Sequence, residues 1–277
     1  KYTGIVEAYG ETSLAGGHES YKSNVVKIGG EILEAGNIDF SDYIGMFVKV
    51  YYKADDSNGD TALHAVIDSK TSYIDIKDSD IADNTTKSAV NYYDNNKQKT
   101  AKISSGAIFI YNGKRLDVAA DADLLTGNGS LRLISNDGDA VYDVVIIKSY
   151  DTFIVDKAMA ADCAVTAKYD RGTFDFDDDF TTTYYIDGEE TEFSSITSGS
   201  VLSVAFSKNT SGDVLAKVYI SNNQVSGKAV RLNRDGKRSV ELEDGSRYDF
   251  TDEYESRIES GEGNTYEPTI GEEGTFY

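Results

Sequence analysis

The sequence predicts an all-β protein, organised as tandem small antiparallel β-barrels of the OB or SH3-like type with very little helix. Short runs of β-branched and aromatic residues recur along the 277 residues, which include 20 Tyr and 11 Phe. The 25 glycines supply many tight turns, whereas a single proline argues against a stiff extended linker. No window shows a convincing amphipathic helix. Without a βαβ rhythm, antiparallel barrels or sandwiches are expected.

The clearest strand signals are short apolar or alternating runs that favour a pleated, half-buried surface. They lie at residues 47–52, 73–76, 107–111, 130–134, 142–147, 152–155, 181–186, 202–206 and 214–220. Asn-Gly and Asp-Gly pairs lie between these runs and tolerate the positive φ angles of tight hairpin turns. These pairs occur at residues 112–113, 187–188, 235–236 and 244–245.

A sequence repeat of three short segments occurs more than once in the chain. Residues 1–8 and 224–230 give the first segment, and residues 25–32 and 240–248 give a second strand with a tight turn. The third segment starts with a glycine and runs into a strand, and its copies begin at Gly45, Gly199 and Gly271. Such self-similarity indicates a tandem array of one small fold. Repeat arrays more often have structural or spacing roles than catalytic ones.

The repeat divides the chain into four predicted modules. They are residues 1–78, 79–155, 156–223 and 224–277, the last an incomplete barrel. The boundary near residue 156 is the least defined, because the apolar runs on either side could belong to either neighbour. This leaves open that one barrel is inserted into another. The first residue is Lys1 and the last residues resemble a strand, so we expect a processed chain or part of a longer polypeptide.

Composition restricts the partners. The net charge is 27 − 48 = −21 and the isoelectric point is near 4.4, so nucleic acid and anionic lipid are disfavoured as partners. The simplest reading of the acidity is that it keeps a Tyr-rich β-protein from aggregating. No apolar run approaches the roughly 20 residues that span a bilayer, so direct membrane insertion is not expected. The only cysteine, Cys163, rules out an internal disulfide and is expected in a buried strand.

The best motif for a ligand is the acidic turn at residues 135–143. Oxygen-bearing side chains at alternate positions suit calcium, and the candidate ligands are Ser135, Asp137, Asp139 and Asp143. Two features depart from a full calcium loop: Ser135 replaces a carboxylate, and Ala140 stands where a glycine is expected. The alternative is a plain acidic turn between two strands. Apart from this calcium, no cofactor is expected.

Two other acidic stretches and the paired tyrosines have simpler structural interpretations. Residues 175–180 could hold a cation but more readily form a solvated loop or edge strand, and residues 55–60 indicate a hairpin loop. Tyr51-Tyr52 and Tyr92-Tyr93 could stack on sugars, although core packing is the commoner role of tyrosine in strands. In a strand, only one member of each pair can face solvent.

Enzymatic readings have little support. The two histidines, His18 and His64, have no second histidine or cysteine near them in sequence, so a zinc site is not expected. No nucleophile elbow, P-loop or dinucleotide fingerprint occurs in its required strand-to-helix setting. With 48 acidic residues, any chosen carboxylate pair is uninformative about glycoside hydrolysis. We expect no catalytic residues.

Three segments carry a family resemblance: residues 45–53 (Gly-x-x-Val-x-Val-Tyr-Tyr-Lys), residues 110–114, and residues 129–150 with their Asn-Asp-Gly-Asp core. With Gly199 and Gly227 in similar settings, this order resembles the β-rich regions of clostridial cell-surface proteins, which often also carry S-layer homology domains. Similar modules occur in bacteriophage virion proteins. The resemblance covers most of the chain, and its motifs are structural rather than catalytic.

The resemblance and the repeat together imply a structural, non-catalytic array of β-modules in an extracellular assembly on a bacterial surface, such as an S-layer or filament. The expected partners are further copies of the chain or neighbouring surface proteins. A virion structural protein is the first alternative, with neighbouring virion proteins as partners. A carbohydrate-binding surface module is the second alternative.

Overall fold

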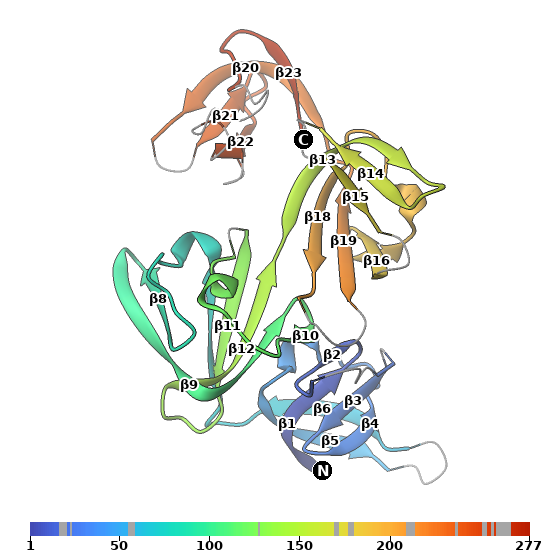
Figure 1. The fold of residues 1–277 in the computed structure, drawn as a ribbon, viewed down its shortest axis with the longest axis vertical. Coiled ribbons are helices and arrows are strands. Elements are labelled where there is room, and N and C mark those ends of the chain that lie inside the picture. The colour runs from blue at the N-terminus through green and yellow to red at the C-terminus, as the bar shows by residue number, and fades with distance from the viewer. Residues whose placement is uncertain are drawn as a thin grey trace. The chain divides into compact units, whose positions relative to one another are not determined.

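A computed structural model of the chain is nearly all β (Figure 1). It describes residues 1–16, 21–22, 24–54, 59–126, 128–168, 172–176, 180–208, 214–235, 238–250, 254–255, 258 and 267–277. The chain forms two compact units. The first comprises Lys1–Ser149 and Phe206–Leu215, and the second comprises Tyr150–Ala205 and Ala216–Tyr277. In the described residues, no helix is long and apolar enough to cross a bilayer.

The first unit begins with a closed five-stranded barrel, which we call module 1. Its strands are β1 (Tyr2–Tyr9), β3 (Val25–Ile28), β4 (Glu31–Glu34), β5 (Phe47–Lys53) and β6 (Thr61–Ile67), with the short β2 (Thr12–Ser13) beside β1. The order is β1-β3-β4-β6-β5, and antiparallel pairing of β5 with β1 closes it. Strands β4 and β6 are parallel, which makes this a Greek-key barrel of the OB type.

A second sheet in the same unit, module 2, follows the same order but stays open. Its strands are β7 (Ser72–Lys77), β8 (Ala89–Asp94), β9 (Lys97–Tyr111), β10 (Lys114–Arg115), β11 (Gly129–Ser135) and β12 (Val141–Ser149). The order is β7-β11-β12-β9-β8, with β12 and β9 parallel. In module 1 the first two strands, β1 and β3, pair along a ladder. The corresponding contact in module 2 is a single bridge between Ile81, which follows β7, and Tyr92 of β8.

The second unit contains module 3, a seven-stranded sheet, and module 4, a four-stranded sheet. Module 3 has β13 (Asp151–Met159), β14 (Ala164–Ala167), β15 (Thr173–Asp175), β16 (Thr181–Ile186), β17 (Glu189–Thr191), β18 (Val201–Phe206) and β19 (Leu215–Ser221). Module 4 has β20 (Val225–Asn233), β21 (Ser239–Leu242), β22 (Arg247–Asp249) and β23 (Glu273–Phe276). Their orders are β15-β14-β13-β18-β19-β16-β17 and β22-β21-β20-β23.

One ring order therefore underlies all four modules. Numbered within a module, the strands follow 1-2-3-5-4 and return to 1. Module 1 closes this ring, modules 2 and 3 open it at different places, and module 4 shows strands 1 to 4. The fourth strands are β5, β11, β18 and β23, and the fifth strands of modules 1 to 3 are β6, β12 and β19. The all-β barrel class predicted from the sequence is confirmed.

The first strands of modules 1, 3 and 4 also share a β-bulge at the same position. Pairing with the second strand shifts by one residue after Val6 in β1, after Val155 in β13 and after Ala229 in β20. In each case the four residues before this point pair with the fourth strand, for example Tyr2 to Ile5 with β5. A bulge bends the strand, so one strand can serve both sides of the barrel. The recurring sequence phrase thus marks equivalent positions.

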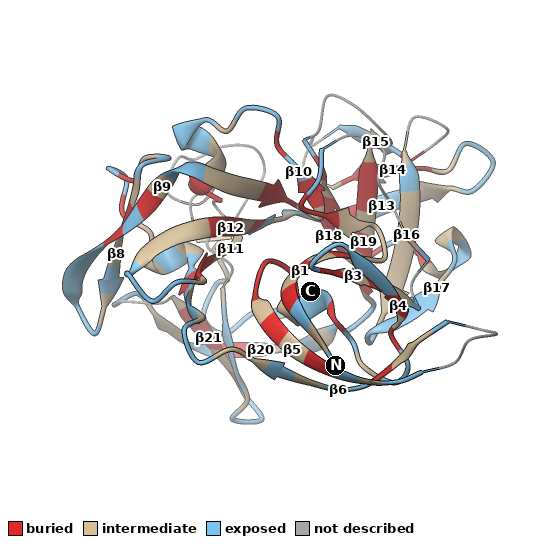
Figure 2. Cartoon of the chain, turned by 90° about the horizontal axis from the view of Figure 1, so that it is seen from below, coloured by how far each residue is buried: buried red, intermediate tan, exposed pale blue. Residues whose placement is uncertain are grey.

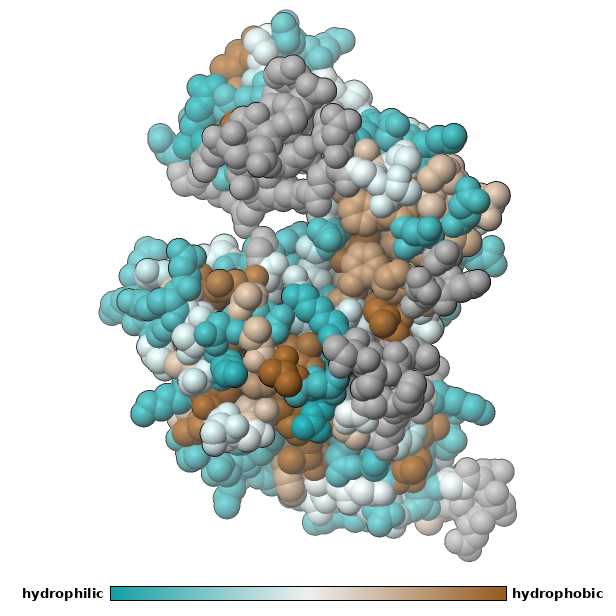
Figure 3. All heavy atoms as spheres, viewed as in Figure 1, coloured by the Kyte–Doolittle hydropathy of each residue, from teal (hydrophilic) through white to brown (hydrophobic). Residues whose placement is uncertain are grey.

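Each module is built around alternating buried side chains. In β1 and β5, the inward residues Val6, Ala8, Val48 and Val50 have no exposed surface (Figure 2). The core of module 1 includes Ile110, Ile134 and Val144 of module 2, whose other buried residues form a separate cluster. Hydrophilic residues cover much of the surface visible in Figure 3, with apolar residues in smaller groups.

Eight of the nine strand runs expected from the sequence lie within strands, and the ninth, residues 214–220, begins one residue before β19. The hairpins at residues 112–113, 187–188 and 244–245 are confirmed, with Asn112 and Asp187 at φ 46° and 51°. The pair at residues 235–236 extends outside the described residues. The predicted module boundaries near residues 78, 156 and 223 remain predictions about folding units. In sheet membership, β7 joins the second sheet and β13 the third.

The expectation for Cys163 was wrong. The residue lies in the turn before β14 with φ 46°, and its side chain is half-buried. The apolar residues that suggested a strand begin at Ala164, one position later.

Candidate functional site: the joint between consecutive modules

A glycine corner recurs just before the fourth strand of three modules. The N–H of Gly45 donates to the carbonyl oxygen of Val6 at 3.0 Å, and the N–H of Val6 donates to Met46 at 3.0 Å. These bonds tie the bulge of the first strand to the start of the fourth strand. Gly45 has φ 81°, a conformation that side chains with a Cβ disfavour.

The same corner occurs twice in the second unit. The N–H of Gly199 donates to Val155 at 2.8 Å, and the N–H of Gly271 donates to Ala229 at 2.8 Å. Their φ angles are 90° and 94°. Identical bonding at three places shows that the third repeated segment in the sequence has one structural role.

In the first unit, Asn136 of module 2 caps the corner of module 1. Asn136 lies in the turn between β11 and β12. Its side-chain Nδ2 donates to the carbonyl oxygen of Gly45 at 2.9 Å, and its Oδ1 accepts from the N–H of Phe47 at 2.8 Å and from Thr71 Oγ1 at 3.1 Å. One side chain therefore satisfies a backbone donor and a backbone acceptor at the start of β5.

Apolar contacts reinforce the cap. Ile44 and Met46, on either side of Gly45, are each 2% exposed and pack in one cluster with Ile134 and Val144 of module 2. The approach is so close that a Cβ on Gly45 would lie 2.8 Å from Val144 Cγ1. Modules 1 and 2 therefore share this one cluster, the shared core, whereas the other buried residues of module 2 form a separate cluster. We call this region the module joint.

Module 4 makes a related contact with the corner of module 3. The Nε2 of Gln224, just before β20, donates to the carbonyl oxygen of Gly199 at 3.3 Å. Tyr277, just after β23, also takes part in this contact. A carbon of its ring lies 3.1 Å from the Cβ position of Gly199, and its hydroxyl accepts a hydrogen bond from Lys168 Nζ at 3.0 Å. In both units the carbonyl oxygen of the corner glycine, Gly45 or Gly199, thus accepts a hydrogen bond from a side-chain amide of the following module.

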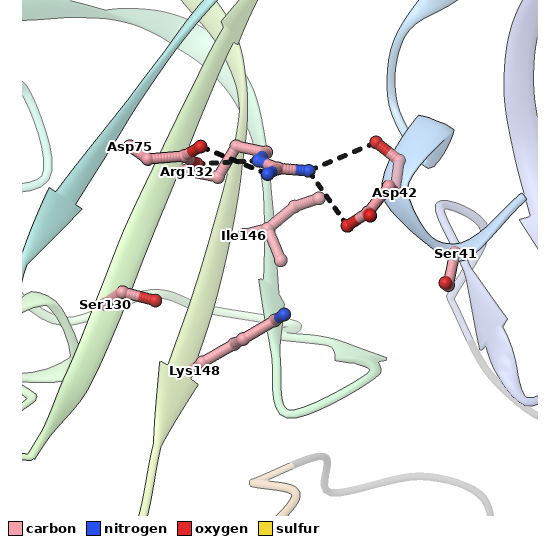
Figure 4. A pocket seen from close by; sticks show the side chains of 7 residues that line it. All are labelled: Ser41, Asp42, Asp75, Ser130, Arg132, Ile146 and Lys148. Carbon is pink, nitrogen blue, oxygen red and sulfur yellow. Dashed lines mark hydrogen bonds and ion pairs between the residues drawn. The ribbon is translucent and has the colours of Figure 1, made fainter. Parts of the chain in front are cut away.

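An arginine fork forms the open side of the joint between modules 1 and 2 (Figure 4). Arg132 of β11 bonds Asp75 of β7 in a bidentate pair, with Nε to Oδ1 at 2.7 Å and Nη2 to Oδ2 at 3.1 Å. Its Nη1 reaches the backbone oxygen of Asp42 at 3.1 Å, and Tyr73 lies under the guanidinium at 5.0 Å from its ring centroid. The hydrogen bond to Asp75 raises the pKa of Arg132, so the charge is permanent. Lys148 and Ser130 line the same shallow hollow.

Replacing Arg132 by alanine is expected to lower the free energy of unfolding by about 1–2 kcal/mol, because the pair is bidentate but partly open to water. The side chains of Arg132 and Asp75 are 24% and 52% exposed. Urea unfolding of the full chain measures the loss, and Arg132→Lys should recover only part of it because an ammonium lacks the planar fork. Equal stability of Arg132→Ala and the parent would contradict this role.

The acidic turn predicted to bind calcium is held by its own hydrogen bonds. Asp137 Oδ1 accepts from the N–H of Asp139 at 3.2 Å and from Ser135 Oγ at 3.4 Å. Asp139 accepts from the N–H of Val141 at 2.7 Å, and Asp143 from the N–H of Asn136 at 3.4 Å. In the part of the chain that the structure describes, no three His, Cys, Asp or Glu side chains gather to hold a metal. Calcium here stays a prediction.

The electrostatics of this turn differ from one carboxylate to the next. Hydrogen bonds from Asp139 lower the pKa of Asp137, so its contribution to stability is present near neutral pH and is lost as the pH falls. Burial raises the pKa of Asp143, so this group favours the fold only while protonated, and that contribution is lost as the pH rises.

Replacing Asp143 by asparagine is therefore expected to leave the melting temperature unchanged or slightly raised at pH 7 in the presence of EDTA, because a neutral amide avoids the burial penalty. If calcium binds the turn, millimolar calcium should raise the melting temperature of the parent and not that of Asp143→Asn. Differential scanning calorimetry at pH 7 with EDTA or calcium measures both effects. A lower melting temperature of the variant in EDTA would contradict the first expectation, and an unchanged parent in calcium would contradict the second.

The other candidates from the sequence do not converge. His64 lies on the exposed face of β6 and stacks on Tyr51 at 6.3 Å between ring centroids, while Tyr52 stacks on Tyr2. As expected from strand alternation, Tyr51 and Tyr93 are the exposed members of their pairs, each 47% exposed. His18, residues 55–58 and residues 177–179 lie outside the described residues.

Sequence reasoning missed two features. Asn136 was given no role of its own in the predicted calcium turn. No local sequence pattern indicates that its side chain contacts another module. A group of three tyrosines was also missed: Tyr185 stacks on Tyr219 at 5.4 Å, and Tyr150 meets Tyr219 edge-on at 5.9 Å. Tyr185 lies in β16 and Tyr150 between β12 and β13, both distant from Tyr219 in sequence, so only the fold brings the three rings together.

Comparison with known proteins adds no assignment: neither a scan against protein-family models nor a search of curated proteins found a match to this chain.

Proposed function

We propose that this chain is a structural, non-catalytic array of β-modules in an extracellular assembly on a bacterial surface, such as an S-layer or filament. The observation that carries the proposal is the module joint, in which Asn136 and the shared apolar cluster with Ile134 and Val144 fasten module 2 to the corner of module 1. A protein that spaces or bears load needs consecutive modules that do not swivel freely. A joint with a shared core resists such motion.

The surface chemistry supports the same role. A net charge of −21 keeps an array of strand edges soluble, and like charge limits uncontrolled edge-to-edge pairing. The surface location itself rests on the resemblance to clostridial cell-surface proteins. Contacts with further copies or neighbouring surface proteins would form by strand addition at exposed edges. A virion protein of the same modules is the nearest alternative.

Negative-stain electron microscopy of the purified protein tests the proposal. At high protein concentration, with and without calcium, we expect ordered sheets or filaments. Particles that remain monomeric under all these conditions would count against an assembly role. Labelling intact bacteria or purified virions with an antibody to the chain would then separate the two locations.

Carbohydrate binding is a second candidate, favoured by the Tyr150, Tyr185 and Tyr219 group. Tyr219 is 40% exposed, and stacked aromatic rings on a sheet can pack against sugar faces. A glycan array with the folded protein tests it, with Tyr219→Ala as the binding variant and Tyr93→Ala as the exposed-tyrosine control. No binding at all would remove this candidate, and binding that survives Tyr219→Ala would place the sugar site away from this tyrosine group.

A further inference from the structure

The fourth strand of module 4 differs from its three counterparts in what lies beside it. In modules 1 to 3 the fourth strand lies between the first and fifth strands: β5 between β1 and β6, β11 between β7 and β12, and β18 between β13 and β19. In module 4, β23 pairs with the first strand β20. Among the described residues, no strand occupies its other side.

The burial of equivalent residues shows the consequence. Register with the first strand aligns Val48 of β5 and Leu202 of β18 with Gly274 of β23. Val48 and Leu202 are fully buried, whereas Gly274 is only half-buried. The same difference in exposure occurs two residues further along the fourth strand.

At that position, Val50 and Val204 are 0% and 1% exposed, and their counterpart Phe276 is only half-buried. The Phe276 ring lies over its own strand, because its Cζ is 3.5 Å from the Cβ position of Gly274. The core of module 4 is therefore incompletely covered along β23.

The fifth strands of the other modules define what would cover it. Their inward residues end in a small or branched residue followed two positions later by isoleucine. These pairs are Ala65 and Ile67, Val145 and Ile147, and Val218 and Ile220. In modules 1 and 2 these residues lie opposite inward residues of the fourth strand, such as Val48 opposite Ile67 and Leu131 opposite Ile147.

We propose that the edge of β23 that no described strand occupies is a strand-acceptor site. Its occupant is an antiparallel β-strand from outside residues 1–277, with a small or branched residue and isoleucine two positions apart on its inward face. Backbone hydrogen bonds would continue the sheet, and the inward pair would cover Gly274 and Phe276. The exposed Glu273 favours a lysine or arginine on the outward face of the strand, as Lys217 lies on β19. This inference deepens the proposed assembly function and rests on it for its biological use.

A peptide supplies the test. The probe is a capped peptide of residues 214–223, which contains β19, added to the full 277-residue protein. The control peptide carries Val218→Asn and Ile220→Asn, so its charge is unchanged while its inward face is polar. Hydrogen exchange followed by mass spectrometry should show amide exchange in residues 273–276 slowed about tenfold or more at saturating probe, because added strands protect backbone amides. The control peptide should leave exchange unchanged.

Three outcomes would overturn the proposal. The first is no protection of β23 by the probe, and the second is equal protection by both peptides. The third is protection of β23 that rises with protein concentration in the absence of peptide, which would assign the edge to a second copy of this chain. The peptide result is independent of micrographs: monomers in negative stain with specific probe binding would reject the assembly function and leave the acceptor edge.

Discussion

Gly45→Ala is expected to destabilise the first unit by about 3 kcal/mol or more, because backbone strain and crowding of the joint add together. The residue has φ 81°, and a Cβ would lie 2.8 Å from Val144 Cγ1 and 3.2 Å from Ile134 Cδ1. Both side chains belong to the shared core and have little room to move. Hydrogen exchange of β5 in the full chain, together with urea unfolding, measures the loss.

The two equivalent glycines provide matched controls. Gly199→Ala meets the flexible end of Gln224 and the Tyr277 ring, so its cost should be smaller. Gly271→Ala has no atom within 4 Å of the new Cβ, and its expected cost of about 1–2 kcal/mol reports backbone strain alone. If Gly45→Ala costs no more than Gly271→Ala, module 2 does not press on the corner of module 1.

Asn136→Ala is expected to cost about 2–4 kcal/mol, because the N–H of Phe47 and the carbonyl of Gly45 lose their partner in a half-buried joint. The bonds removed are those at 2.8 Å and 2.9 Å. The expected signature is local: faster amide exchange in β5 and in the turn at residues 135–143, with β13 to β19 unchanged. Hydrogen exchange of the full chain measures it.

Two further variants sharpen this prediction. Asn136→Asp keeps an acceptor for Phe47 but loses the donor to Gly45 and adds charge beside Asp143, so it should be nearly as damaging as alanine. Asn24→Ala removes a side-chain bond to Glu34 on the exposed surface and should cost less than about 0.5 kcal/mol. Equal effects of Asn136→Ala and Asn24→Ala would show that the joint bonds contribute little.

The repeat could be predicted because it depends on local sequence features. A glycine before a strand, as at Gly45, Gly199 and Gly271, records a backbone need for positive φ, which glycine meets without strain. Alternating apolar residues likewise record one buried face, so strands such as β5 and β18 were found. These features depend on near neighbours and are therefore visible without the fold.

Other strands carry weaker local signals. In β6 a bulge breaks the alternation, because the partner of Tyr51 is His64 and that of Tyr52 is Ala62, leaving Leu63 between them. The first half of β9 is rich in lysine and polar residues, yet it pairs with β8 along its length. Backbone pairing across the sheet, rather than side-chain pattern, holds these segments in strands.

The joint was beyond sequence reasoning for a different reason. Asn136 and Gly45 are 91 residues apart, and Asn136 Nδ2 reaches the carbonyl of Gly45 only because β11 and β12 place their turn beside β5. The acidic neighbours of Asn136 drew attention to cation binding instead. A contact between modules depends on tertiary placement, which residue spacing does not encode.

Amide exchange at the three corners tests the common plan most directly. The N–H groups of Gly45, Gly199 and Gly271 each donate to a first-strand carbonyl at 2.8–3.0 Å. Nuclear magnetic resonance of the full chain should therefore find all three amides protected well above the neighbouring turn residues. Rapid exchange of Gly199 or Gly271 alongside a protected Gly45 would contradict a single repeated module.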